Sequence, residues 1–393
     1  MSKRIRLAIV DRPSRRYLDY SVIDTPLSLY IHFPWCARKC PYCDFNSHEV
    51  KGDIPETQYV ETLVQDLAFE IKSESRTNLR SIFMGGGTPS LFSAAAIHTL
   101  LANIKDRFDI SKSEITLEAN PGTFDQAHFD GYRKAGVNRL SIGAQSFSAN
   151  ALTQLGRIHG PDDIQLAYDG ARQAGFKRIN IDLMHGLPGQ TLADALTDLK
   201  RAIELQPEHI SWYQLTVEPN TKFYKYPPIL PKDRVLEDIF IAGNDLLQSA
   251  GFLQYEVSAY SLPLEESRHN LNYWQFGDYL GIGAGAHGKI SRANQVIRTT
   301  KSKMPVEYLQ RPEGKLKVVD TKELKLEFLL NTLRLTNGFD LSLFEKTTGL
   351  GSGLLDSFLE QAISRGFLVR KINQIIPTEK GRLFLNDLLM LVD

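Results

Sequence analysis

The sequence alternates between short strand-like runs and longer stretches with helical periodicity. This alternation is typical of parallel strands that are joined by crossover helices. We expect strands at 27–33, 80–85, 115–120, 139–144, 178–184 and 210–216, and helices at 55–74, 93–107, 124–135, 160–174 and 192–205. About six such β/α units predict an α/β fold built on a partial (β/α)6 TIM-like barrel, whose ligands bind at the carboxyl ends of the strands.

The chain divides into four predicted segments, namely an N-terminal arm (1–26), a barrel core (27–233), a barrel extension (234–310) and a C-terminal helical module (321–393). The extension contains a predicted helix at 234–250, an extended run at 252–260 and a glycine-rich turn at 281–285. We expect this turn to allow a close approach of the backbone to a bound ligand. The C-terminal module contains predicted helices at 323–335 and 354–365, an extended pair at 366–376 and a helix from Thr378. These elements predict a winged-helix-like unit, but without the basic excess of a nucleic-acid-binding module, so we expect a packing or lid role.

Charge and hydropathy narrow the range of partners. Lys+Arg and Asp+Glu both number 46, so the net charge of zero indicates no general preference for nucleic acid or membrane surfaces. The arm is basic, which we interpret as a solvated tail, with a targeting segment or a membrane-touching arm as alternatives. No window approaches the 18 or so apolar residues of a membrane span, and the N-terminus lacks the apolar core of a secretory signal, so we expect a cytoplasmic protein.

All three cysteines of the chain fall in one short motif after the first predicted strand. Cys36, Cys40 and Cys43 have the spacing C-x3-C-x2-C. An odd number of clustered thiols is no disulfide framework, whereas three thiolates can ligate three irons of a [4Fe–4S] cluster and leave the fourth iron open for chemistry. The alternatives are a zinc site completed by His32 or His48, which would be unusual with three ligands in one loop, and three incidental cysteines.

Polar residues and glycines follow the next predicted strands. The run Gly85–Ser90 offers bare backbone amides to a ligand, although a glycine run alone also fits a simple turn. Glu118, Gln145, Arg157 and Asp182 follow at or near the ends of later strands. Each alone fits a structural hydrogen bond or ion pair equally well, but together they would surround one rim of the barrel.

The cysteine motif is the hallmark of the radical S-adenosylmethionine (SAM) superfamily. Together with Gly85–Ser90, Glu118–Pro121, Gln145–Phe147 and Asp182–Pro188, it resembles the family of oxygen-independent coproporphyrinogen III oxidase and of the HemW heme chaperones, over residues 27 to about 390. The resemblance implies a [4Fe–4S] cluster on the three cysteines and a SAM molecule that chelates the open iron. The SAM contacts that it implies are made by Tyr30, Tyr42, Asp44, Gly86, Gly87, Thr88, Glu118, Gln145, Arg157, Asp182 and Thr216.

Three departures separate the chain from the oxidase branch. The oxidase pattern has a further cysteine two residues after the third, where this chain has Phe45, and a longer N-terminal arm. This chain also contains His269–Trp274, which resembles the H-N-x-x-Y-W motif of the heme chaperones. Imidazole is a good axial ligand for heme iron, and aromatic rings can flank the macrocycle, so His269 is our candidate heme ligand and His287 a second one. A lone histidine is otherwise more often a structural residue.

The resemblance therefore implies a heme chaperone that binds heme, SAM and a [4Fe–4S] cluster and delivers heme to respiratory hemoproteins. It further implies an electron donor for the cluster, no oxidase activity, and contact with the membrane only through partners. Whether SAM is cleaved stays open. The main alternative is an oxygen-independent coproporphyrinogen III dehydrogenase, and a zinc-stabilised binding module is a third, distant one.

Overall fold

The computed structural model describes residues 25–123, 125–292 and 295–392. Six strands coincide with the predicted apolar runs, and each pairs in parallel with the next along the chain. They are β1 (Leu27–Phe33), β4 (Ser81–Gly86), β5 (Glu114–Ala119), β6 (Arg139–Gln145), β7 (Ile179–His185) and β8 (His209–Gln214). Their side chains are almost all buried, as expected for parallel strands that are covered on both faces.

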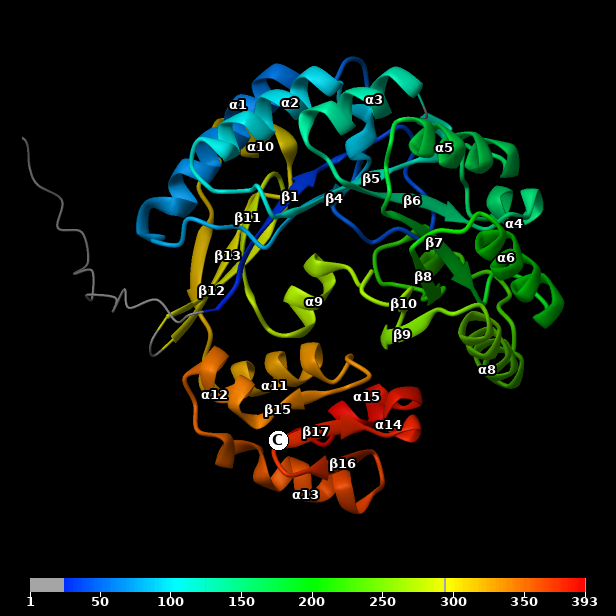
Figure 1. The fold of residues 1–393 in the computed structure, drawn as a ribbon, viewed down its shortest axis with the longest axis vertical. Helices are drawn as coiled ribbons and strands as arrows, with labels where there is room; N and C mark the ends of the chain where they lie inside the picture. Colours follow the sequence, from blue (N-terminus) through cyan, green and yellow to red (C-terminus); the bar gives the residue numbers. More distant parts are fainter. Residues whose placement is uncertain (1–24, 124, 293–294, 393) are drawn as a thin grey trace, which may run out of the picture.

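Helices connect these strands and form an arc around the outside of the sheet (Figure 1). They are α1 (Glu56–Glu70), α2 (Ala94–Lys105), α3 (Gln126–Ala135), α4 (Ala149–Gln154), α5 (Pro161–Gln173), α6 (Leu192–Glu204) and α8 (Asp233–Ser249). Local signals fix several ends: Thr191 forms a capping box at the start of α6, and Gly136 ends α3 in the left-handed conformation. The predicted helices of the core and the helix at 234–250 are confirmed within a few residues.

Further strands extend the sheet at both edges. The predicted extended run at 252–260 is a hairpin of β9 (Leu253–Glu256) and β10 (Ala259–Ser261) beside β8. At the other edge, β11 (Asp278–Ile282) pairs in parallel with β1, followed by the antiparallel β12 (His287–Arg292), β13 (Gln295–Thr300) and β14 (Lys315–Val318). Among the described residues the 12-stranded sheet runs β14-β13-β12-β11-β1-β4-β5-β6-β7-β8-β10-β9 and stays open, which confirms a partial barrel.

The glycine-rich turn after β11 approaches protein, not a ligand as we predicted. Gly283 and Gly285 both have positive φ angles, of 105° and 84°. A side chain at Gly283 would meet the backbone of His32, and one at Gly285 would meet the side chain of Asn46. The glycines therefore allow this turn to pack closely against the end of β1 and the loop that follows it.

Residues after β14 form a separate C-terminal unit, which lies below α9 (Arg268–Trp274) in Figure 1. Its elements are α11 (Thr321–Thr332), β15 (Phe339–Asp340), α12 (Leu341–Thr348), α13 (Asp356–Ser364), β16 (Leu368–Lys371), β17 (Gln374–Pro377), α14 (Glu379–Leu383) and α15 (Leu385–Leu389). The predicted helices and hairpin are present, but α12 and β15 were not predicted, and the terminal helix breaks at Phe384. The unit has its own apolar core around Phe328, which also includes Phe276 of the barrel extension.

The predicted segment boundaries remain a prediction, and residues 1–24 of the arm lie outside the described part of the chain. The short elements that complete the fold are β2 (Trp35–Cys36), β3 (His48–Glu49), α7 (Lys222–Lys225) and α10 (Pro305–Gln310).

A buried ionic cluster joins β11 and β12 to the start of β1. The carboxylate of Asp278 accepts hydrogen bonds from Lys289 Nζ at 3.0 Å, Arg76 Nη1 at 2.9 Å and Thr25 Oγ1 at 3.1 Å. The side chains of Asp278 and Lys289 are 0% and 1% exposed. Lys289 and Arg76 hold the pKa of Asp278 below its ordinary value, although burial alone would raise it. The strand β12 is thus polar in sequence yet buried, because its lysine is paired inside.

Candidate functional site

A cavity of about 510 Å³ lies at the carboxyl ends of the parallel strands. It brings together residues from the loop after β1 and from the ends of β4, β5, β6 and β7, as predicted for a barrel. The predicted site residues that line it are Cys36, Cys40, Tyr42, Cys43, Gly86, Gly87, Thr88, Glu118, Gln145, Arg157 and Asp182.

The cysteine loop is closed by backbone hydrogen bonds. Residues Trp35 and Cys36 pair with β3, and the Cys43 amide donates to the Cys40 carbonyl at 3.2 Å. The loop is attached to the barrel rim through α7, since the Phe223 amide donates to the carbonyl of Pro41 at 3.0 Å. All three thiols are partly exposed to the cavity. Burial raises the pKa of Cys36 and Cys43, so iron binding would have to displace their protons.

The glycine run after β4 packs directly on the cysteine loop. The Gly87 amide donates to the Phe33 carbonyl at 2.6 Å, and the Thr88 amide donates to the Trp35 carbonyl at 2.7 Å. A side chain at Gly87 would collide with those carbonyls, and Gly86 has a φ angle of 111°. The close packing of the two loops therefore requires glycine at positions 86 and 87, whether or not a ligand also contacts them.

Two carboxyl groups, Glu118 on β5 and Asp182 on β7, line the cavity. The Gly86 amide donates to Glu118 Oε2 at 3.0 Å, and Ser141 and Asn180 donate to Asp182 at 2.9 and 2.7 Å. Burial raises the pKa of both groups. Burial is the main reason why the pKa of Glu118 rises to about 8, and the negative charge of Asp182 adds to the effect. A carboxyl group with this pKa is mostly protonated at pH 7.

We expect the raised pKa of Glu118 to make SAM binding depend on pH. If Glu118 accepts hydrogen bonds from SAM as a carboxylate, binding requires loss of its proton below about pH 8. SAM affinity should then rise with pH, by up to about tenfold per unit, and level off above about pH 8. Equilibrium dialysis of SAM against the cluster-loaded protein measures this dependence.

The variant Glu118→Gln should bind SAM more weakly and with a flatter pH profile. Glu204→Gln, on the exposed face of α6, is the matched control and should follow the wild type. An unchanged pH profile in Glu118→Gln would remove Glu118 from the SAM contacts.

Arg157 links the cysteine loop to β6. Its Nη2 donates to the Gly143 carbonyl at 2.8 Å and its Nη1 lies 3.7 Å from Cys40 Sγ. Its buried Nε has no hydrogen-bond partner among the described residues. The neighbouring cavity residue Gln145 has a left-handed backbone conformation, with a φ angle of 66°, and its Oε1 accepts a hydrogen bond from the Tyr213 hydroxyl at 2.7 Å. Arg157 thus lines the cavity and retains one buried donor without a partner among the described residues.

Three predicted SAM contacts do not line the cavity. Tyr30 donates to or accepts from His32 Nδ1 at 2.7 Å, and its ring lies 5.8 Å from that of Phe83. Asp44 is exposed on the cysteine loop. Thr216 is exposed two residues beyond the end of β8, where we had expected the strand to continue. Their SAM contacts remain predictions.

His269 lies on α9 but faces away from the cavity lining. Its ring stacks on Phe83 at 4.1 Å, and its Nδ1 lies 3.1 Å from Glu114 Oε1 and 2.9 Å from Ser267 Oγ. Burial lowers the pKa of His269, although Glu114 opposes this effect. The second candidate, His287, is exposed at the start of β12, also outside the lining. In this conformation neither histidine is presented to the cavity.

The cavity also contains residues outside the predicted SAM and cluster contacts. Among them are Arg38, Phe45, Ser47, Ser211, Tyr213, Glu256, Ser258, Asn270, Trp274 and Arg334. Asn270 and Trp274 belong to the same motif as His269. Ser211 and Tyr213 are two residues apart on β8, so their side chains point to the same face of the strand, and this spacing could have indicated that both face the cavity. Arg334 belongs to the C-terminal unit, and no feature of the sequence linked it to this site.

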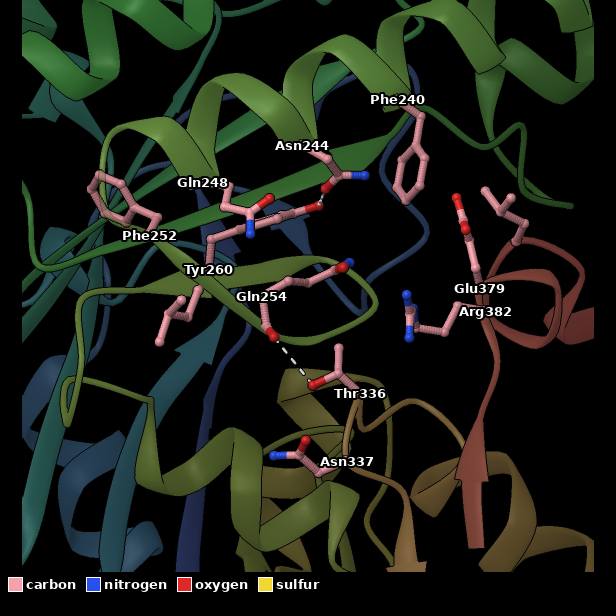
Figure 2. Close-up of a pocket in the computed structure, with 12 residues that line it drawn as sticks. Phe240, Asn244, Gln248, Phe252, Gln254, Tyr260, Thr336, Asn337, Glu379 and Arg382 are labelled. Atoms are coloured by element: carbon pink, nitrogen blue, oxygen red, sulfur yellow. Dashed lines mark hydrogen bonds between the residues drawn. The ribbon is translucent and has the colours of Figure 1, made fainter. Parts of the chain in front are cut away.

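A second cavity, of about 500 Å³, lies where α8 and the β9–β10 hairpin face the C-terminal unit. Figure 2 shows Phe240, Asn244 and Tyr260 on one side and Glu379 and Arg382 on the other. None of the predicted site residues lines it. We therefore assign it to the junction of the two parts of the chain.

The open parallel barrel and the three-cysteine loop at its strand ends define a radical SAM protein. The family model of the radical SAM superfamily matches residues 30–202, and that of the HemN C-terminal domain matches residues 319–384. The solved structure of coproporphyrinogen III oxidase HemN from Escherichia coli is similar to this one, with a TM-score of 0.79 and 24% sequence identity. The match covers 94% of this chain and 90% of the HemN chain. That likeness shows the shared fold.

Curated relatives narrow the class further. The heme chaperone HemW of Escherichia coli is 48% identical over 93% of this chain and 98% of that protein. HemW of Haemophilus influenzae is 49% identical over 93% of this chain and 97% of that protein. HemW of Bacillus subtilis is 33% identical over 92% of this chain and 97% of that protein. This chain belongs to the HemW family of heme chaperones.

The residues of the cavity fit the two cofactors that a radical SAM protein implies. Three thiols on one loop suit a [4Fe–4S] cluster. The unpartnered Nε of Arg157 and the carboxyl groups of Glu118 and Asp182 offer donors and acceptors to the polar groups of SAM. Such a cluster would supply the electron for any reductive cleavage of SAM.

Proposed function

We propose that this chain is a heme chaperone that binds heme together with SAM and a [4Fe–4S] cluster. It delivers the heme to respiratory hemoproteins and does not oxidise coproporphyrinogen. One observation carries the proposal: Asn270 and Trp274 of the H-N-x-x-Y-W motif line the same cavity as the three cysteines. The motif that distinguishes the heme-chaperone branch is therefore positioned to act on whatever binds beside the cluster.

Within this proposal, Cys36, Cys40 and Cys43 hold the cluster. The proposed SAM contacts are Tyr30, Tyr42, Asp44, Gly86, Gly87, Thr88, Glu118, Gln145, Arg157, Asp182 and Thr216, of which Tyr30, Asp44 and Thr216 lie outside the cavity lining. A role for His269 as an axial heme ligand requires its ring to leave Glu114 and turn toward the cavity. Phe45, which stands where the oxidase pattern has a further cysteine, supports the absence of oxidase activity.

The cellular setting is part of the proposal. No helix in the described part of the chain is long and apolar enough to cross a membrane. We propose that the protein acts in the cytoplasm, receives electrons for its cluster from a donor protein, and reaches respiratory acceptors at the membrane through partners.

The decisive experiment combines three assays on one anaerobically reconstituted sample. Iron and labile sulfide are measured first, because zinc without sulfide would favour the zinc-stabilised module. Heme is then titrated by absorbance, and conversion of coproporphyrinogen to protoporphyrinogen is assayed with SAM and reductant. We expect stoichiometric heme binding without conversion, whereas conversion without heme binding would indicate the dehydrogenase.

The role of His269 is tested on the same sample. His269→Ala should weaken heme binding and change the heme spectrum, whereas His98→Ala, on the exposed face of α2, should do neither. Because His269 also contacts Glu114, thermal unfolding of both variants is measured in parallel. Wild-type heme affinity and spectrum in His269→Ala would leave His269 as a structural residue.

A further inference from the structure

The C-terminal unit contributes one side chain, Arg334, to the cavity that holds the cysteine loop. Arg334 follows the end of α11, and its backbone carbonyl accepts from the Val257 amide at 3.1 Å. Thr336 continues the contact, since its amide donates to Tyr255 and its hydroxyl to Gln254, both at 3.1 Å (Figure 2). The segment 334–336 is thus fixed along β9, and this contact determines where the arginine side chain lies.

Two neighbours orient the guanidinium group of Arg334. It lies 4.3 Å from the ring centre of Trp274, and its Nη2 donates to Glu256 Oε2 at 3.0 Å. The Glu256 side chain is 4% exposed and that of Arg334 is 27% exposed. Stacking on the indole and pairing with a buried carboxylate restrict the planar group to one orientation, so it is preorganised for a further partner.

Two buried donors at this place have no acceptor. Arg334 Nε and Trp274 Nε1 both lack a hydrogen-bond partner within the described ranges. A buried N–H without an acceptor is costly, and such groups in a binding cavity are commonly satisfied by a ligand. Trp274 and Arg334 come from α9 and from the C-terminal unit, respectively, so the pair exists only because the two parts of the chain meet here.

We propose that Arg334, with Trp274 Nε1, binds a carboxylate of the macrocyclic ligand, that is, a propionate group of heme. The inference rests on the proposed function and deepens it. A carboxylate accepts several hydrogen bonds at once and complements the planar donors of a guanidinium group. Glu256 holds Arg334 in place and competes with the incoming carboxylate for it.

The test compares heme with its dimethyl ester, in which both propionates are esterified. Both are titrated into the cluster- and SAM-loaded wild type, Arg334→Met and Arg382→Met. Methionine keeps apolar contact with Trp274 but removes charge and donors, and Arg382 lines only the second cavity, which makes it the matched control. We expect the wild type and Arg382→Met to bind heme about tenfold or more tightly than the ester, in line with a charge-assisted hydrogen bond.

Arg334→Met should lose this preference while its affinity for the ester stays within about twofold of the wild type. Trp274→Phe removes a single donor and keeps an aromatic ring, so it should reduce the preference partly, and it provides the test if Arg334→Met does not fold. A wild type without preference for heme over the ester, or an Arg334→Met that keeps the preference, would overturn the inference. A wild type that binds neither compound would refute the proposed heme binding itself.

Discussion

Replacing Cys40 with serine is expected to abolish assembly of the [4Fe–4S] cluster. The three cysteines are the only ones in the chain, and all three line the cavity, so no other thiol can take the place of a missing ligand. Anaerobic reconstitution of the wild type should yield about four irons and four sulfides per chain, and the variant should yield close to none in cubane form. Iron and sulfide analysis with electron paramagnetic resonance of the reduced sample measures the difference. Cys36→Ser and Cys43→Ser should behave alike.

Phe45→Ala is the control for this experiment. Phe45 lies on the same loop with its side chain 61% exposed, and it should be replaceable without loss of iron. A Cys40→Ser protein that retains the wild-type amount of iron and sulfide would contradict the assignment of the loop.

Replacing Asp278 with alanine is expected to lower the free energy of unfolding by about 3–5 kcal/mol. The substitution leaves the ammonium group of Lys289 buried without its carboxylate, and it also removes one of the two carboxylate partners of Arg76, the other being Glu74. Urea denaturation followed by circular dichroism measures the loss as a shift of the midpoint at constant slope.

Two further variants define the origin of that loss. Lys317→Ala breaks an ion pair with Glu323 whose side chains are 64% and 45% exposed, and it should cost less than about 1 kcal/mol. Adding Lys289→Met to Asp278→Ala should recover part of the lost stability, because the unpaired buried charge is then gone. An Asp278→Ala protein as stable as the Lys317→Ala control would show that the buried cluster contributes little.

The β/α core could be predicted from the sequence because its signals are local. Apolar runs such as Leu27–Phe33 and glycine at the end of α3 depend only on neighbouring residues. The strand β12 was missed for the opposite reason. Its sequence, His287–Arg292, is polar, and it is buried only because Lys289 pairs with Asp278 of another strand. Hydrophobic periodicity does not report such pairing.

The same distinction holds in the site. Cys36, Glu118 and Asp182 follow predictable strands, so the topology alone places them at one rim. The motif on α9 was recognised, but the sequence did not show that Trp274 faces the cavity while His269 faces Glu114. Arg334 reaches the cavity through the docking of a separate unit, which no local pattern encodes.

The contact between segment 334–336 and β9 also covers one edge of the main sheet. β9 is an edge strand of the main sheet, and Leu335 forms an antiparallel bridge with Glu256 along its outer side. Exposed edge strands are templates for pairing with other chains. A protein shortened to its barrel would present this edge to solvent, so we expect it to pair with copies of itself and precipitate. The C-terminal unit thereby covers one of the two edge strands of the main sheet, β9, whereas β14 at the other edge is exposed.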